Sequence, residues 1–305
     1  MNNLIVVDSE KAIPNLENAK KVFDVLDVQE SSRSDYKARI HLFIEFLHNN
    51  PINLDSFLQF KRWLDARPDY AVSTKNKYLI TAKIFLKELA RRGVLPSDIT
   101  QNIKTFKQIK KHKRDGINDA EMDRLIQALR ELPILPENTR LKAILSLLTF
   151  QGLRLAEVTR LDVSDLDFVN KTALIQSKGA DDKELIALHP EAVATLREYL
   201  KASNIADGPL FICRSNNRRN ARLTTQSIGR VVKDLLRYLN VEKTPHGFRH
   251  YFVTRLIKNY KSDLLAVAQY SRHRSLEMFV VYNDNVNLQA DLPRFYRAFE
   301  GLSFQ

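Results

Sequence analysis

The stretch "TPHGFRHYFVTRL", residues 244–256, reads as the start of an amphipathic helix with polar groups in its first turns. Thr244 suits the cap position, and Pro245 suits the first helical position, where its missing N–H costs nothing. Phe248, Phe252 and Leu256 recur every four residues, which predicts a buried stripe on one side of the helix.

The same stretch places a histidine and an arginine at the predicted helix start. His246 and Arg249 are three residues apart, so they share one face near the N-terminus. Free N–H groups and partial positive charge at a helix N-terminus make such a pair suited to a phosphate, and Gly247 would let a ligand backbone approach closely. A surface His and Arg without function is the alternative for this segment taken alone.

Composition favours a two-domain protein with a polyanionic partner. The chain has 305 residues, 44% of them hydrophobic and 28% charged, which is enough for two globular domains. Its formal net charge is +12. Such an excess argues most often for nucleic acid, although ribosome-associated or merely basic proteins have it too.

Other features bear on the compartment. Cys213 is the single cysteine, so no internal disulfide forms. No apolar stretch is long enough to span a bilayer, and the start "MNNLIVVDSE" lacks the basic leader of a signal peptide. We expect a cytoplasmic protein with no membrane partner.

Residues 1–107 are predicted to form an all-helical domain. Helical periodicity favours helices within residues 34–50, 52–68 and 72–93, the last opening on Ser73 or Thr74 and ending at Gly93. The stripe of the first consists of Tyr36, Ile40, Phe43 and Leu47. Lys75 and Lys83 lie on the polar face of the third, which is either solvated or turned toward DNA.

Two further basic segments are candidate DNA contacts. The run "KTFKQIKKHKR", residues 104–114, holds six basic side chains and no acidic one, and predicts a linker over 108–116. As a strap along a phosphate backbone it would act through Lys110, Lys111, Lys113 and Arg114. The loop "CRSNNRRNARLTT", residues 213–225, offers Arg218, Arg219 and Arg222 for backbone or groove contacts, with a solvated hairpin equally favoured.

Residues 117–305 are predicted to form a mostly helical domain with a small sheet. Asn118 and Glu121 have the spacing of a capping box at the start of its first helix. Alternating polar and apolar residues over 166–189 predict an antiparallel sheet of about three strands. Helices are predicted near 137–150, 152–161, 190–203, 224–239, 244–256 and 262–271. The fold class is therefore mainly α (α+β).

Several common chemistries lack their motifs. The chain has no glycine-rich phosphate loop, no Cys or His spacing typical of a metal site, and no Gly-x-Ser-x-Gly turn. We expect neither a cofactor nor a metal.

Five short polar clusters remain in the second domain. They are "QGLRLAE" with Arg154, "SKGADDK" with Lys178, "HGFRH" with His246 and Arg249, "SRHRS" with His273, and "VVYND" with Tyr282, nine residues after His273. Their order and spacing resemble the tyrosine recombinase family of site-specific DNA recombinases, also called the phage integrase family. The resemblance covers the whole second domain, and the helical segment over 73–93 resembles the core-binding domain that precedes it there.

The resemblance implies an active site made of Arg154, Lys178, His246, Arg249, His273 and Tyr282. In this family the tyrosine cleaves DNA and forms a 3′-phosphotyrosyl link. The residue types fit that chemistry, because a phenol is a competent nucleophile and two guanidiniums stabilise the charge of the phosphorane. The lysine would protonate the leaving 5′ oxygen, and the histidines would move or donate protons.

Alternatives stand beside three of these assignments. Arg154 is also placed for a plain ion pair with Glu157 in the same helix. Lys183 lies on the same hairpin as Lys178, and Tyr270 is a second tyrosine near His273.

Departures from the family pattern lie near His273 and Tyr282. The family commonly has Leu-Gly before the later histidine, whereas this chain has Ser271 and Arg272, and Arg272 is expected to contact phosphate or to be exposed. Asp284 stands where the family often has His.

The resemblance also implies how the protein assembles. Two protomers would bind double-stranded DNA with inverted half-sites, and two such sites would synapse as a homotetramer. The C-terminal segment, apolar on one side, would pass to the neighbouring protomer. A type IB topoisomerase and a non-catalytic DNA-binding regulator are the alternative functions, and integrase, transposon recombinase or Xer-like resolvase are all open as the biological role.

Overall fold

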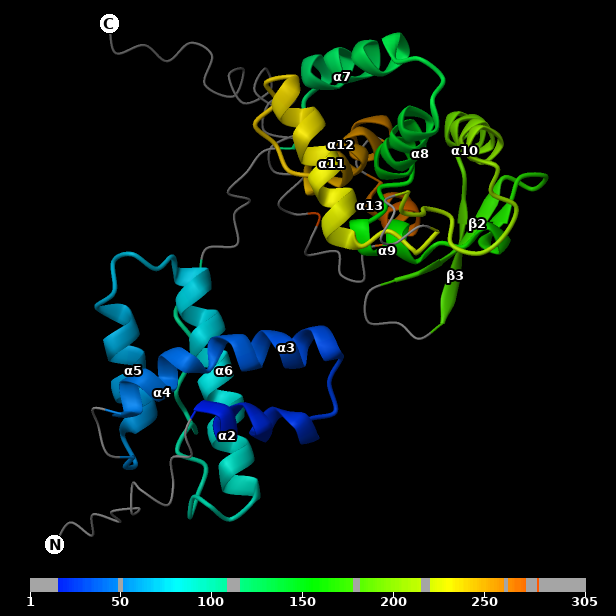
Figure 1. The fold of residues 1–305 in the computed structure, drawn as a ribbon. Coiled ribbons are helices and arrows are strands. Elements are labelled where there is room, and N and C mark those ends of the chain that lie inside the picture. The colour runs from blue at the N-terminus through cyan, green and yellow to red at the C-terminus, as the bar shows by residue number, and fades with distance from the viewer. Residues whose placement is uncertain are drawn as a thin grey trace, which may run out of the picture. The chain divides into compact units, whose positions relative to one another are not determined.

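The computed structural model describes residues 16–48, 52–108, 116–177, 182–214, 220–260, 263–272 and 279. The chain divides into two compact units, Met1–Lys110 (unit 1) and Lys111–Gln305 (unit 2), and each is described by itself (Figure 1). Within the described ranges, no helix combines the length and the apolar character needed to cross a membrane.

The regular secondary structure of unit 1 is all helical in its described part. Its elements are α2 (Leu16–Lys21), η1 (Val22–Val25), α3 (Glu30–Arg39), α4 (His41–His48), α5 (Ser56–Asp65) and α6 (Val72–Arg91). The predicted stripe is confirmed, because Ile40, Phe43 and Leu47 are buried in its core and Tyr36 packs against them. The single helix expected over 34–50 is instead two helices, α3 and α4, which meet at Ile40.

The two ends of α6 differ in how well the sequence predicts them. Gly93 has a φ of 72°, and the N–H of Val94 donates to the carbonyl of Leu89 at 3.0 Å, so the predicted glycine stop is confirmed. The predicted Ser73 or Thr74 cap is wrong. The helix begins at Val72, and no side chain caps it.

A buried carboxylate near the end of α6 ties this helix to η1. Hydrogen bonds from Arg91 and Arg92 hold the pKa of Glu88 at about 2, below its ordinary value of 4.5 and against the opposing effect of burial. Arg92 also donates to the carbonyl of Val22 at 3.1 Å. Glu88 therefore stabilises unit 1 as long as it is ionised.

Unit 2 consists of helices packed around α8 (Pro136–Phe150), with a small sheet at one side (Figure 1). Its elements are α7 (Asp119–Glu131), α8 (Pro136–Phe150), α9 (Leu155–Arg160), η2 (Val163–Asp165), β1 (Leu166–Asp167), β2 (Thr172–Gln176), β3 (Lys183–Ala187), α10 (Pro190–Ser203), α11 (Thr225–Tyr238), α12 (His246–Asn259) and α13 (Leu264–Ser271). The capping box is confirmed, since Asn118 and Glu121 exchange hydrogen bonds of 2.8 and 2.9 Å.

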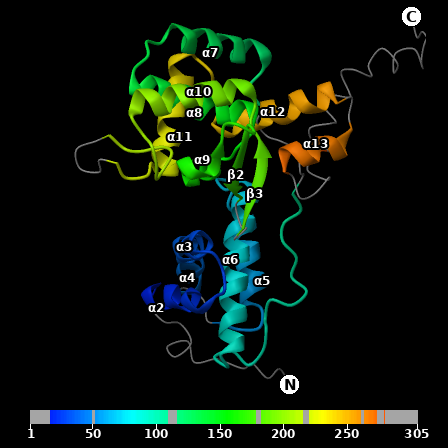
Figure 2. The same ribbon diagram turned by 90° about the vertical axis from the view of Figure 1, so that its right-hand side faces the viewer.

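The sheet is antiparallel, with strand order β1-β2-β3. Leu166 lies opposite Ala173, and Thr172 lies opposite Ala187. The hairpin of β2 and β3 projects from the helices in both ribbon views (Figures 1 and 2). The predicted fold class, mainly helical with a small antiparallel sheet, is confirmed.

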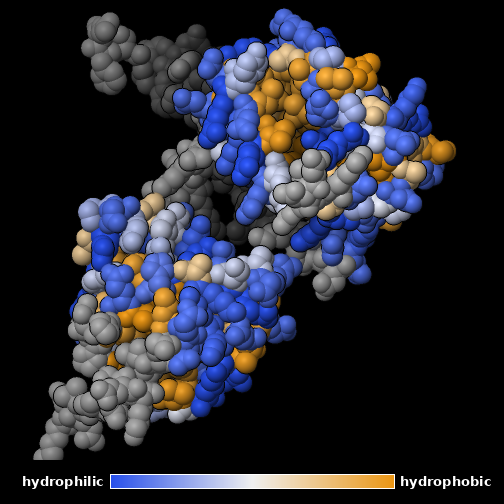
Figure 3. Space-filling view, viewed as in Figure 1, coloured by the Kyte–Doolittle hydropathy of each residue, from blue (hydrophilic) through white to orange (hydrophobic). Residues whose placement is uncertain are grey.

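Helix α8 is the centre of unit 2. It packs against α9, α10, α11 and α12, and its residues Ile144, Leu147 and Leu148 are buried in the main core. On the face of unit 2 visible in Figure 3, hydrophobic side chains gather in a patch with hydrophilic ones around it. Because α9, α11 and α12 all contact α8, their polar side chains are held in a fixed relation to one another.

Candidate active site

A hollow of about 740 Å³ lies on unit 2 where three segments meet. Residues 153–155 at the start of α9 form one side, residues of α11 between 225 and 237 form another, and residues 244–249 at the start of α12 form the third. The hollow therefore brings together Arg154, His246 and Arg249, three of the six side chains predicted for the active site.

The start of α12 differs in detail from its prediction. The helix begins at His246, with Pro245 in the cap position and no side-chain cap, so the expected cap at Thr244 is wrong. Phe248 is fully buried as expected, and Phe252 and Leu256 are partly buried. Gly247 packs against the protein itself, because a Cβ there would lie 3.2 Å from a side-chain carbon of Ile117. The close approach seen at Gly247 is therefore made by Ile117, and the expected ligand approach there stays a prediction.

Arg249 is only 2% exposed, although it carries a charge. Its Nη1 donates to the carbonyl of Gly152 at 2.7 Å, and its Nη2 donates to the carbonyl of Ser271 at 2.6 Å. A surface arginine without a role does not have this arrangement. Two backbone acceptors fix the plane of the guanidinium at the edge of the hollow.

Gly152 makes the hydrogen bond from Arg249 to its carbonyl possible. Its φ is 57°, a conformation that glycine adopts without steric cost, and a Cβ at this position would lie 2.3 Å from Cδ1 of Phe252. The residue thus lets the chain after α8 run closely against α12. That approach brings the Gly152 carbonyl to Arg249.

Arg154 forms the predicted ion pair and also faces the hollow. Its Nη1 donates to Oε1 of Glu157 at 2.8 Å, and its backbone N–H donates to Oε2 of the same carboxylate, also at 2.8 Å. Glu157 is 0% exposed, whereas the Arg154 side chain is 35% exposed. One edge of the guanidinium is therefore oriented by a buried acid while the group keeps access to the hollow.

The remaining charge at the hollow is mostly positive. His246 is exposed at the N-terminus of α12, one turn from Arg249. On α11 the hollow is lined by Arg230, Lys233 and Arg237, together with Asp234. Cationic side chains and a helix N-terminus on three sides suit the hollow to a phosphodiester.

The basic residues of α11 are functional candidates that our reading of the sequence missed. Arg230, Lys233 and Arg237 follow a spacing of three and four, which places them on one helical face. The spacing was visible, but nothing in the sequence indicated that this face lies beside Arg154 and His246.

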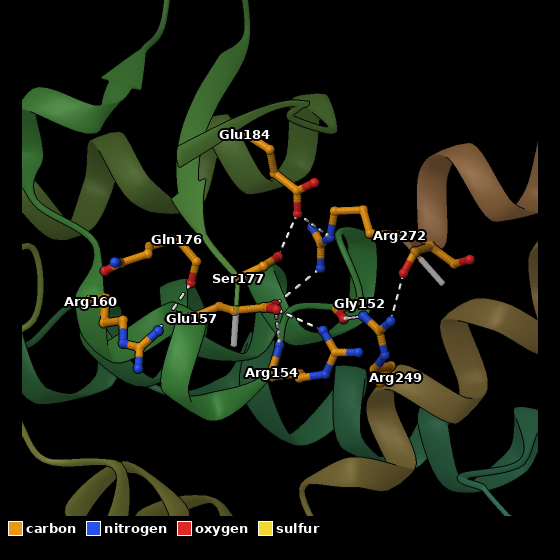
Figure 4. A network of polar contacts seen from close by, with 10 residues as sticks. Gly152, Arg154, Glu157, Arg160, Gln176, Ser177, Glu184, Arg249 and Arg272 are labelled. Atoms are coloured by element: carbon orange, nitrogen blue, oxygen red, sulfur yellow. Dashed lines mark hydrogen bonds and ion pairs between the residues drawn. The ribbon is translucent and has the colours of Figure 1, made fainter. Parts of the chain in front are cut away.

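A network of polar contacts extends from Arg154 to the hairpin (Figure 4). Arg272 donates from Nη2 to Oε2 of Glu157 at 3.1 Å, and its Nε lies 3.5 Å from Oε1 of Glu184 on β3. Ser177, at the end of β2, donates to the same Glu184 oxygen. Burial lowers the pKa of Arg272, and the charges of Glu157 and Glu184 oppose that effect.

Arg272 is thus neither exposed nor a candidate phosphate contact, and both expectations for it are wrong. Its side chain is 7% exposed and binds two carboxylates. Ser177 and Glu184 were missed entirely, because a polar pair at the end of a hairpin carries no sequence signal of its own.

Several predicted site residues lie outside the described residues. They are Lys178, His273 and Tyr282, the linker residues Lys110, Lys111, Lys113 and Arg114, and Arg218 and Arg219. Of their alternatives, Lys183 forms an ion pair with the buried Asp165. Tyr270 lies on α13 with its ring 5.8 Å from that of Tyr260 and is not among the described residues that line the hollow.

Two candidate DNA contacts have structural tasks. Lys75 is 8% exposed and donates to the carbonyl of Asp65 at 2.8 Å at the end of α5. Arg222 donates to the carbonyls of Thr159 and Leu161, both at 2.9 Å, and pairs with Asp162. Their charges are used within the protein, because the polar face and the loop that carry them pack back on neighbouring elements. Lys83, on α6, is half-buried.

Comparisons with known proteins agree with this geometry. The model of the phage integrase family matches residues 116–288. Tyrosine recombinase XerC of Roseiflexus sp. (strain RS-1) is 29% identical over 240 residues, which cover 76% of this chain and 74% of that protein. Tyrosine recombinase XerD of Oceanobacillus iheyensis is 29% identical over 222 residues, covering 70% and 71%.

Solved structures share the fold. The XerH site-specific recombinase bound to palindromic difH substrate superposes with a TM-score of 0.72 at 16% identity, over 94% of this chain and 87% of that one. The integrase of the Tn1549 transposon in complex with transposon right-end DNA gives a TM-score of 0.64 at 15% identity, over 87% and 94%. The family match spans more than half of the chain, including all three sides of the hollow. The chain belongs to the phage integrase family, and it is a Xer-like enzyme of the tyrosine recombinases.

Proposed function

We propose that this enzyme is a site-specific DNA recombinase that cuts and rejoins strands through Tyr282. The phenolic oxygen gives its proton to His246 and forms a bond to phosphorus, the bond from phosphorus to the 5′ oxygen breaks, and Lys178 gives that oxygen its proton. The product is a 3′-phosphotyrosyl link with a free 5′ hydroxyl. Attack of such a hydroxyl on a second link rejoins the strands.

The observation that carries the proposal is the pairing of Arg154 and Arg249 at one hollow. Both guanidiniums are oriented by contacts within the protein, and the hollow between α9, α11 and α12 is lined by both. Two such forks stabilise the charge that gathers on the phosphoryl oxygens, as a divalent cation does in other phosphoryl-transfer enzymes. His246 takes or positions a proton at this site, and His273 donates to a non-bridging oxygen.

DNA binding in this proposal uses surfaces of both units. Arg230, Lys233 and Arg237 contact phosphates beside the cleaved bond, and Lys83 contacts the backbone from unit 1. The linker residues Lys110, Lys111, Lys113 and Arg114 and the loop residues Arg218 and Arg219 add further phosphate contacts. Lys75 and Arg222 are not included, because their charges are bound within the protein. A cytoplasmic, DNA-associated location goes with this function.

Assembly is part of the same proposal. Two protomers bind inverted half-sites, and two sites synapse as a homotetramer. The C-terminal segment of each protomer covers an apolar surface of its neighbour. A groove on unit 2 lined in part by Ile126, Leu129 and Leu256 supports this arrangement, because these apolar side chains of α7 and α12 are exposed or only partly buried and are left for such a segment to cover.

The experiment starts from a pool of nicked duplexes with a randomised central stretch, incubated with the full chain. Covalent adducts that resist denaturation are isolated, and their DNA is sequenced to give the site. The native protein forms adducts and Tyr282→Phe forms none. Tyr270→Phe is the matched control, because Tyr270 contacts Tyr260 outside the hollow, and it retains adduct formation.

The recovered site then separates the alternatives. Exchange of strands between two linear duplexes supports the recombinase. Adducts with relaxation of a supercoiled plasmid but no strand exchange identify a type IB topoisomerase. If the native protein retains duplexes from the pool but forms no adduct with any of them, it is a non-catalytic regulator and the proposal is overturned.

A further inference from the structure

Arg272 has an unusual backbone and an unusual environment. It ends α13 with a φ of 55°, in the left-handed region that residues other than glycine and asparagine rarely adopt. Its guanidinium is almost fully buried. A buried charge on a strained residue persists only where its contacts outweigh both costs.

The first of those contacts changes the electrostatics of the hollow. Glu157 is fully buried and offers Oε1 to the Arg154 guanidinium and Oε2 to Arg272. With Arg154 alone, the carboxylate would cancel the charge of that arginine. With Arg272 added, the trio of Arg154, Glu157 and Arg272 has a net charge of +1. Glu184, the second carboxylate beside Arg272, is 45% exposed, so solvent screens its opposing charge, and Arg154 is the exposed member that presents the excess.

The second contact of Arg272 is with Glu184, and it connects Arg272 to the sheet. Glu184 on β3 accepts from Ser177 and lies 3.5 Å from Nε of Arg272. Ser177 immediately precedes residue 178 in the sequence. The carbonyl of Ser271, next to Arg272, accepts from Arg249. Arg272 and its neighbour Ser271 therefore connect the end of α13 to Glu157 and its partner Arg154, to Arg249, and to the turn end of the β2–β3 hairpin (Figure 4).

We propose that Arg272 is a positioning residue. It neutralises Glu157, so that Arg154 offers its charge to a phosphate, and it holds the turn end of the hairpin and the end of α13 against Arg154 and Arg249. The inference rests on the proposed function for its effect on DNA cleavage. Its electrostatic part applies to any phosphate in the hollow.

The test uses Arg272→Met, which keeps most of the side-chain volume and removes the charge. The rate of adduct formation on the nicked duplex recovered above falls about tenfold to hundredfold. The dissociation constant for that duplex changes by a smaller factor, because many other phosphate contacts contribute to it. Arg272→Lys recovers part of the rate. Arg197→Met is the matched control, because Arg197 is an exposed arginine of α10 that stacks on Phe168 away from the hollow, and its rate equals that of the native protein.

A double variant separates charge from packing. In Glu157→Gln with Arg272→Met the trio regains its excess positive charge, so binding of inorganic phosphate, which is weakened in Arg272→Met, recovers toward the native affinity. A purely structural role predicts the opposite, because a second buried contact is lost. Phosphate binding is measured by calorimetric titration at constant ionic strength, on variants whose circular dichroism matches the native protein.

The outcomes distinguish this inference from the proposed function. Adducts from the native protein with an undiminished rate in Arg272→Met overturn the inference and leave the recombinase intact. No adduct from the native protein, together with the expected order of phosphate affinities, overturns the recombinase and supports the role of Arg272. A double variant that binds phosphate more weakly than Arg272→Met overturns the electrostatic role.

Discussion

Gly152→Ala tests the close approach on which the arginine pair depends. Two costs add in this variant. A left-handed backbone costs an alanine about 1–2 kcal/mol, and a Cβ placed 2.3 Å from Cδ1 of Phe252 forces a shift that costs about 1–3 kcal/mol. We expect the free energy of unfolding of unit 2 to fall by about 2–5 kcal/mol.

Gly208 provides the control, because it has a φ of 72° with no atom within 4 Å of a Cβ built on it. Gly208→Ala therefore carries only the backbone cost of about 1–2 kcal/mol. Adding Phe252→Leu to Gly152→Ala removes the ring and restores part of the difference between the two glycine variants.

The assay is urea unfolding of the full chain followed by far-ultraviolet circular dichroism. The single tryptophan, Trp63, lies in unit 1, so its fluorescence marks the unfolding of that unit and the remaining amplitude reports unit 2. Equal losses of unfolding free energy in the two glycine variants would show that the contact between residue 152 and Phe252 carries no cost, contrary to this prediction.

Three further predictions concern charge. Because the pKa of Glu88 is held at about 2 in the folded state, its stabilisation is present above the ordinary pKa of 4.5 and is lost as the pH falls from about 5 toward 2. The shift corresponds to at most about 3 kcal/mol, which solvent screening at an exposed arginine partner reduces to about 2 kcal/mol. The Trp fluorescence midpoint in urea should therefore change less with pH over this window in Glu88→Gln than in the native protein, and an equal change in the two proteins would contradict the assignment. Arg249→Lys loses the double contact with two backbone carbonyls, so adduct formation falls by about a hundredfold or more in a gel assay, and a native rate would show that a point charge is enough. Lys83→Met lowers the slope of log affinity against log salt by about 0.9, whereas Lys75→Met leaves the slope unchanged and destabilises unit 1 by about 1 kcal/mol. A change of slope in Lys75→Met would place that lysine back among the DNA contacts.

Local patterns were enough to predict most elements of the fold. The capping box at Asn118 and Glu121, the glycine stop at Gly93 and the apolar stripe around Ile40 depend on residues within two turns of each other, so the sequence carries them directly. The break at Ile40 and the start of α6 at Val72 were not predictable in this way. Helix ends depend on packing as well as on caps.

The candidate site likewise contains residues that the sequence indicated and contacts that only the fold creates. The family pattern pointed to Arg154 and Arg249, and the fold brings both to one hollow. Arg272 and Glu184 come from segments far apart in the chain, and their pairing exists only once the sheet and α13 are in place. The role of Lys75 could not be predicted from its neighbours in the sequence for the same reason, because the carbonyl that accepts its hydrogen bond belongs to another helix.

The amino acid that carries the DNA in the adduct shows whether Tyr282 is the nucleophile. The trapped adduct is digested with protease and nuclease, and the peptide that retains a nucleotide is sequenced by mass spectrometry. We expect the peptide that contains Tyr282, with the 3′ phosphate on its phenolic oxygen. A nucleotide on the peptide of Tyr270, or on any serine, would contradict it.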